Sequence, residues 1–152
     1  MAQFLDVNVW LPLVWDGHAA AVTARDWVAT REENLVLCRV TQLALLRHLT
    51  NPAIMGGDVL TNRAAAEVEQ HLRGQEGILF EPEPARLAEL FPAVGESEEP
   101  HSQWWTDAYL AAFAIAANHE LATFDHGFAR YEAQGLRWNL LELGGGAVPR
   151  NA

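Results

Sequence analysis

Short apolar runs alternate with longer stretches of helical character along the chain, and this alternation constrains the fold more than any other feature. The predicted strands are residues 3–9, 34–39, 78–80, 121–124 and 136–142. Strands that alternate with helical segments are typical of α/β proteins, in which helices cover both faces of a mostly parallel sheet. We therefore predict an α/β fold.

The helical segments are predicted from apolar spacing and from residues that start or stop helices. Asp58 or Thr61 can cap a helix that ends near Gly74. Ser102 can cap the helix that carries Asp107. The other predicted helical ranges are 18–30, 41–50, 84–91 and 126–134.

The length and composition fit one folded domain. The chain has 152 residues, of which 50% are hydrophobic and 20% are charged, and this balance argues against disorder. We predict a single domain over residues 1–143, followed by a flexible C-terminal tail over residues 144–152.

The sequence also bears on location. No apolar stretch is long enough to span a membrane, and no basic segment followed by an apolar one marks a signal peptide. The single cysteine, Cys38, cannot form an internal disulfide, which is compatible with a reducing compartment. We therefore expect a cytoplasmic protein that does not bind membranes.

The charged residues exclude several classes of chemistry. The net charge of −10 counts against binding long duplex nucleic acid through phosphate neutralisation alone. It leaves room for a nuclease in which a metal ion supplies the local positive charge. All ten basic residues are arginine, so mechanisms that need a lysine, such as P-loop phosphate transfer and Schiff-base formation, are excluded.

Three aspartates follow or flank the predicted strands. Asp6 and Asp125 each come after an apolar run, and Asp107 opens an alanine-rich helical segment. Parallel strands of an α/β sheet end at a common edge, where ligands bind. Carboxylates gathered there favour Mg²⁺ or Mn²⁺, and such a site points to metal-dependent phosphodiester chemistry.

Each candidate also has a structural alternative. Asp6 and Asp125 could cap the helices that follow them, and Asp107 could stabilise a helix dipole. Asn8 would lie on the same side of an extended segment as Asp6, where it could orient Asp6 or close an Asx turn. Thr123 could hydrogen-bond a metal-bound water, although threonine is ordinary in strands.

Four sequence blocks together resemble the PIN-domain family, and most closely the VapC-type toxins of bacterial toxin–antitoxin pairs. The blocks cover residues 4–9, 38–42, 106–110 and 121–125, and they occur in the expected order. Thr106-Asp107-Ala108-Tyr109-Leu110 and Ala122-Thr123-Phe124-Asp125 are the more specific blocks. The resemblance implies a PIN-like three-layer α/β/α sandwich with a mostly parallel central sheet of about four to five strands.

The same resemblance implies a function. The family is expected to act as a Mg²⁺- or Mn²⁺-dependent endoribonuclease, with the toxin of a type II pair neutralised by a small antitoxin and usually dimeric. By motif matching, Asp6, Asp107 and Asp125 take the metal-binding acidic positions. Gln42 stands where the family usually has a glutamate, and an amide supplies an oxygen acceptor but no negative charge.

Substrate contacts and competing functions follow from these assignments. Arg39 or Arg47 could contact the RNA backbone, or could pair with a glutamate instead. The substrate is expected to be an unpaired RNA loop. A PIN-like module that has lost catalysis is one alternative. A haloacid-dehalogenase-like phosphatase is another, but it would need a second acid where Asn8 stands.

Overall fold

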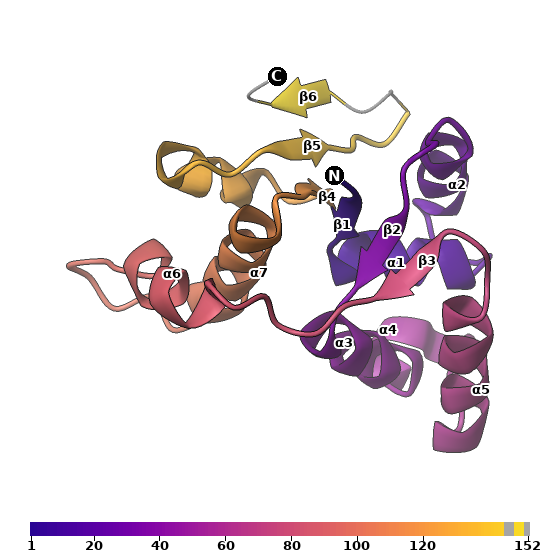
Figure 1. Ribbon diagram of the computed structural model, residues 1–152. Helices are drawn as coiled ribbons and strands as arrows, with labels where there is room; N and C mark the ends of the chain where they lie inside the picture. The colour runs from indigo at the N-terminus through magenta and orange to yellow at the C-terminus, as the bar shows by residue number, and fades with distance from the viewer. Residues whose placement is uncertain (145–147, 151–152) are drawn as a thin grey trace.

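The computed structural model describes residues 1–144 and 148–150, which form one six-stranded sheet with helices packed on it (Figure 1). The strands lie in the order β3-β2-β1-β4-β5-β6; β1 to β5 are parallel, and β6 is antiparallel to β5. Their bounds are β1 Gln3–Leu5, β2 Leu35–Leu37, β3 Ile78–Phe80, β4 Glu120–Thr123, β5 Trp138–Leu140 and β6 Val148–Arg150. The helices are α1 Val7–Val14, α2 Ala21–Ala29, α3 Arg39–Leu49, α4 Pro52–Met55, α5 Asn62–Arg73, α6 Leu87–Val94 and α7 Trp104–Ala117, with 3₁₀ helices η1 Gly56–Asp58 and η2 His126–Gln134.

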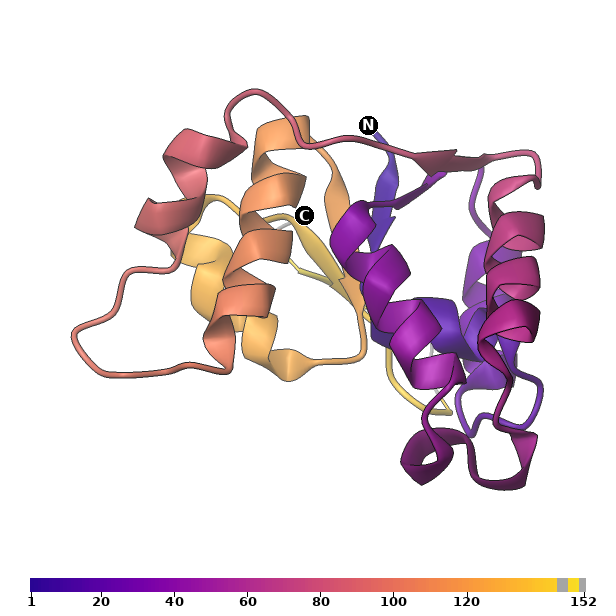
Figure 2. The ribbon, with the colours of Figure 1, turned by 90° about the horizontal axis from the view of Figure 1, so that it is seen from below.

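The sheet separates two hydrophobic cores, because successive side chains of a strand point to opposite faces. On β1, Phe4 joins the core formed with α6, α7 and η2, whereas Leu5 joins the core formed with α1, α2, α3 and α5. Figures 1 and 2 show these two groups of helices on opposite sides of the strands. The predicted α/β sandwich with a mostly parallel sheet is therefore confirmed.

Helix α7 lies close to the sheet because its inner face consists of small residues. Ala111 and Ala114 are fully buried, and neither carries a side chain long enough to hold the helix away from the strands. Phe113 of α7 stacks on Phe4 of β1, with 4.6 Å between the ring centroids and 10° between the ring planes. This packing fixes the middle of α7 against β1, and the helix carries Asp107 in its first turn.

The strand order reverses between β1 and β4. From β1 the chain moves outward to β2 and β3, and it then returns to the other side of β1 to form β4 and β5. Phe4 pairs with Leu121 and Leu5 with Ala122, so the carboxyl ends of β1 and β4 lie side by side. In open α/β sheets, such a switch point leaves the crevice in which ligands bind.

The first strand is shorter than the sequence predicts. Residues 3–9 were predicted to be a strand, but β1 ends at Leu5 and α1 begins at Val7. Asp6 separates the two elements by capping the helix, with Oδ1 accepting the backbone N–H of Val7 at 2.7 Å. The sequence hid this boundary, because Leu5, Val7 and Val9 alternate with the polar Asp6 and Asn8, and such alternation is typical of a strand.

The predicted helix caps have mixed outcomes. Thr61 caps α5, with its hydroxyl accepting the N–H of Ala64, and the helix ends before Gly74 as predicted. The prediction that Ser102 caps α7 is wrong, because Gln103 occupies the N-cap position and makes no capping hydrogen bond through its side chain.

The C-terminal segment differs from a wholly flexible tail. Residues 148–150 form β6, which pairs antiparallel with β5 and covers the backbone groups on its outer edge. The rest of the predicted tail beyond residue 144, namely 145–147 and 151–152, lies outside the described residues. Over the described parts of the chain, no helix is long and apolar enough to cross a membrane.

Candidate active site

Three aspartates come from three elements that meet at the switch point. Asp6 ends β1 and caps α1, and Asp125 follows β4 and caps η2, with Oδ1 accepting the N–H of Gly127 at 2.7 Å. Asp107 lies in the first turn of α7. Asp6 and Asp125 therefore fulfil the capping roles considered as alternatives, and each keeps its second carboxylate oxygen for another partner.

The buried hydroxyl of Thr123 joins the ends of β1 and β4. Its Oγ1 donates to Asp6 Oδ2 at 2.9 Å, and it accepts the side-chain N–H of Asn8 at 3.1 Å and the backbone N–H of Asp125 at 3.0 Å. The hydroxyl of Thr123 thereby uses its one donor and both of its acceptor sites. This arrangement fixes the orientation of Asp6 and the start of the loop that carries Asp125.

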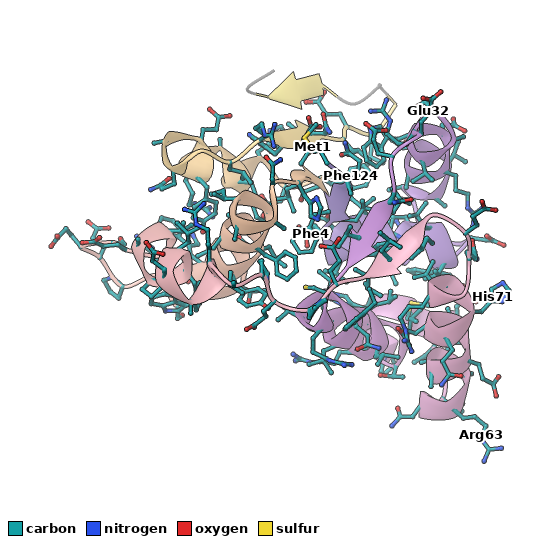
Figure 3. The ribbon with its side chains drawn as sticks, viewed as in Figure 1. Met1, Phe4, Glu32, Arg63, His71 and Phe124 are labelled. Carbon is teal, nitrogen blue, oxygen red and sulfur yellow. The ribbon has the colours of Figure 1, made fainter. Side chains whose placement is uncertain are left out.

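Asn8 supports the same junction, although it does so from a helix. It lies in the first turn of α1, so the prediction that it extends a strand beyond Asp6 is wrong. Its Oδ1 accepts the backbone N–H of Phe124 at 3.2 Å, and its amide nitrogen donates to Thr123. Figure 3 labels Phe124 where the chain leaves β4. Asn8 therefore ties α1 to the end of β4.

The carboxylates are coupled electrostatically. Burial raises the pKa of Asp6 from 3.8 to about 6, although the hydrogen bonds from Thr123 and Val7 oppose the rise; the charges of Asp107 and Asp125 raise the pKa further. Burial and the charge of Asp125 also raise the pKa of Asp107, and Arg130 opposes this effect. The three groups thus share a region where further negative charge is unfavourable.

These side chains suit a hard divalent cation. Asp6 is 7% exposed, so its ionised form loses most of its hydration and gains no compensating ion pair among the described residues. Within the described part of the chain, no three histidine, cysteine, aspartate or glutamate side chains are already close enough to enclose an ion. The fit to Mg²⁺ or Mn²⁺ rests on the chemistry of the donors, since these ions prefer carboxylate oxygens.

Gln42 forms hydrogen bonds with polar residues of α3 and α5, and its predicted supporting role at the metal site stays a prediction. Its amide nitrogen donates to Oε1 of the buried Glu69 at 2.9 Å, and its amide oxygen accepts a hydrogen bond from Arg39. Glu69 is also paired with Arg73. A glutamate at position 42 would place a second carboxylate against Glu69, whereas an amide can donate to Glu69 and accept from Arg39. Glutamine therefore satisfies both neighbours.

The two arginines predicted to contact RNA lie in different surroundings. Arg39 is exposed, and its guanidinium lies over the ring of Phe80, 4.8 Å from the centroid. Arg47 is exposed in the last turn of α3 and borders a hollow between α3 and α5. No described contact joins Arg47 to the aspartates, and both RNA contacts stay predictions.

Two residues near these groups have no signal in the sequence. Glu69 is 3% exposed on α5, and only the packing of α5 against α3 brings it to Gln42. Arg130 of η2 lies with Nη1 3.5 Å from Oδ2 of Asp107. Its position depends on the 3₁₀ course of η2, which apolar spacing does not reveal.

Comparisons with known proteins agree with the fold. The family model described as PIN domain matches residues 4–134. The chain is 38% identical over 138 residues to Ribonuclease VapC41 of Mycobacterium tuberculosis, and the match covers 87% of this chain and 94% of that protein.

Solved structures with lower sequence identity share the fold. One is VapC20 of Mycobacterium tuberculosis, described as a sarcin-ricin loop cleaving toxin, with a TM-score of 0.63 and 19% identity over 89% of this chain and 96% of that one. Another is VapBC-1 from nontypeable Haemophilus influenzae, with a TM-score of 0.65 and 15% identity; the match covers 92% of this chain and 98% of that one. At these identities the likeness supports the fold alone.

The raised pKa of Asp6 predicts a pH-dependent cost to stability. The folded protein holds this proton more tightly than the unfolded chain, so the contribution of Asp6 to stability is fully present below about pH 4 and is lost as pH rises through 6. Asp6→Asn removes this cost. The difference in free energy of unfolding between Asp6→Asn and wild type should therefore shift in favour of the variant by about 2 kcal/mol between pH 4.5 and pH 7.5. Urea unfolding in EDTA measures the difference, and parallel pH profiles would contradict the assignment.

Proposed function

The chain belongs to the PIN-domain family, and we propose that it is a metal-dependent endoribonuclease that serves as the toxin of a type II toxin–antitoxin pair. The observation that carries the proposal is the placement of Asp6 and Asp125 at the ends of β1 and β4, where their charges and that of Asp107 influence one another. The family match decides against the haloacid-dehalogenase-like alternative.

The proposed reaction is hydrolysis of an RNA phosphodiester bond. Asp6, Asp107 and Asp125 would hold Mg²⁺ or Mn²⁺, which, when bound, makes water more acidic and stabilises negative charge on the phosphate. Thr123 fixes Asp6 and the start of the Asp125 loop, and Asn8 braces both. The chain thus contributes carboxylates held in place before the substrate arrives.

An unpaired RNA substrate suits the charge of this protein. With a net charge of −10, the surface disfavours the many phosphate contacts that duplex binding requires. Unpaired bases in loops can instead be recognised by stacking and by hydrogen bonds to their edges. Cleavage of a loop within a structured RNA is therefore the proposed reaction.

Cleavage of a pool of structured RNAs tests the proposal. Wild-type protein should cut with Mg²⁺ or Mn²⁺ and stop in EDTA, and Asp107→Asn should lower the cleavage rate by about 100-fold or more, because it removes a carboxylate ligand. Glu98→Gln is the matched control, since Glu98 is an exposed loop residue. Cleavage that persists in EDTA, or that is equal in Asp107→Asn and wild type, would contradict the function.

An apolar groove offers a place for the antitoxin. A cavity of about 580 Å³ lies between α1, α2, α5 and β3, and is lined mainly by aliphatic side chains. Glu67 and His71 are exposed at its border, and Figure 3 shows His71 on the outer side of α5. An amphipathic helix with basic flanks would cover the apolar lining and complement the acidic protein. We assign this groove to the antitoxin; the predicted homodimer and cytoplasmic location stay predictions.

Substitution in the groove tests the antitoxin assignment. Ala64→Gln adds a longer polar side chain to the lining and should lower the affinity for the antitoxin at least about tenfold, because it obstructs apolar burial. Ala88→Gln makes the same change at an exposed position of α6 and should leave affinity unchanged. Calorimetry with the product of a small open reading frame beside the gene measures both, and equal affinities would contradict the assignment.

A further inference from the structure

Arg130 brings positive charge to the edge of the carboxylate site. It is the one basic residue that a described ion pair joins to the three aspartates, with 3.5 Å between its Nη1 and Oδ2 of Asp107. The side chain of Arg130 is 28% exposed and that of Asp107 is 26% exposed, so both reach solvent. A substrate phosphate that approaches the aspartates would therefore meet this guanidinium.

Aromatic packing holds the guanidinium in place. Its Cζ lies 4.2 Å from the centroid of a Trp104 ring and 5.4 Å from that of Tyr131. Trp104 in turn stacks on His101, at 3.5 Å between centroids. Gly127 leaves the necessary room, since a Cβ there would lie 2.7 Å from Nη2 of Arg130. A guanidinium fixed in this way loses little freedom when it binds an anion.

The fixed guanidinium keeps an unused hydrogen-bond donor. Its Nη1 is buried and has no hydrogen-bond partner among the described residues, although Oδ2 of Asp107 lies 3.5 Å away as an ion-pair partner. A buried donor without an acceptor is costly. An oxygen supplied by a ligand would satisfy it.

We propose that Arg130 binds a non-bridging phosphate oxygen of the RNA strand at the cleavage site, and that Trp104 positions it. The inference rests on the proposed ribonuclease function. A guanidinium offers planar N–H donors that match phosphate oxygens, and its charge offsets the repulsion between phosphate and the aspartates. The recognised chemistry is the phosphate itself, so this contact contributes affinity without base preference.

RNA binding measured by fluorescence anisotropy tests the role of Arg130. The probe is a short fluorescein-labelled single-stranded RNA of random sequence, in Ca²⁺, with gels to verify that the RNA stays intact. Arg130→Met should lower affinity about tenfold, and should reduce the slope of log affinity against log salt by about 0.7, because one phosphate contact is lost. Arg63→Met removes the same charge from an exposed site on α5, which Figure 3 shows far from Phe124 at the end of β4, and should change neither.

Trp104 variants separate positioning from folding. Trp104→Phe keeps an aromatic face and should retain most of the RNA affinity, whereas Trp104→Leu should approach the affinity of Arg130→Met. Thermal unfolding of each variant verifies that it is folded. If Arg130→Met does not fold, Arg130→Lys is used instead; it should keep the salt slope but lose affinity, because it lacks the planar donors.

Two results would contradict the phosphate contact of Arg130, and only the second would also contradict the ribonuclease function. The first is that the wild type cleaves RNA while Arg130→Met keeps the affinity and salt slope of the wild type, or Arg130→Lys keeps its affinity. This result would contradict the phosphate contact and would leave the ribonuclease function supported. A wild type that neither binds nor cleaves RNA would overturn both proposals.

Discussion

The hydroxyl of Thr123 is the point on which the geometry of the site depends. It contacts Asp6, which lies 117 positions earlier in the chain, and it also accepts hydrogen bonds from Asn8 and from the backbone of Asp125. These contacts are possible only because β1 and β4 are neighbours, although most of the chain separates them. The pairing of β1 with β4 thus fixes the position of Asp6 relative to Asp125.

Burial makes this arrangement costly as well as useful. Asp6 would be easier to ionise in water, because burial, and to a smaller extent the charges of Asp107 and Asp125, raise its pKa in the folded protein. Functional sites commonly retain such local conflicts, which the rest of the structure outweighs. Here the two hydrophobic cores on either side of the sheet provide that stability. A cation would offset the cost of keeping the buried carboxylate ionised.

The sequence predicts those features that depend on local pattern. Apolar runs separated by helical segments predict the α/β sheet, and their ends place Asp6 and Asp125 at one edge. The alanine-rich segment that follows Asp107 forms α7, in which the small residues Ala111 and Ala114 are buried. The strand predicted over residues 3–9 is too long, because the alternation of apolar and polar residues continues from β1 into the first turn of α1.

Features that depend on contacts between distant elements are not visible in the sequence. The hydrogen bond between Gln42 and Glu69 requires the packing of α3 against α5, and nothing in the sequence around either residue indicates that they are in contact. Arg130 reaches Asp107 only because η2 turns as a 3₁₀ helix beneath Trp104. Side-chain geometry of this kind follows from the whole fold, whereas an aspartate at the end of an apolar run can be recognised directly.

The central claim is that the three aspartates act as one divalent-metal site, and the most direct measurement is Mn²⁺ binding followed by electron paramagnetic resonance. Metal-free wild type should bind Mn²⁺ saturably. Asp6→Asn and Asp125→Asn should each weaken binding about tenfold or more, while Glu99→Gln in the exposed loop should bind like wild type. Equal Mn²⁺ affinity in all four proteins would contradict the claim.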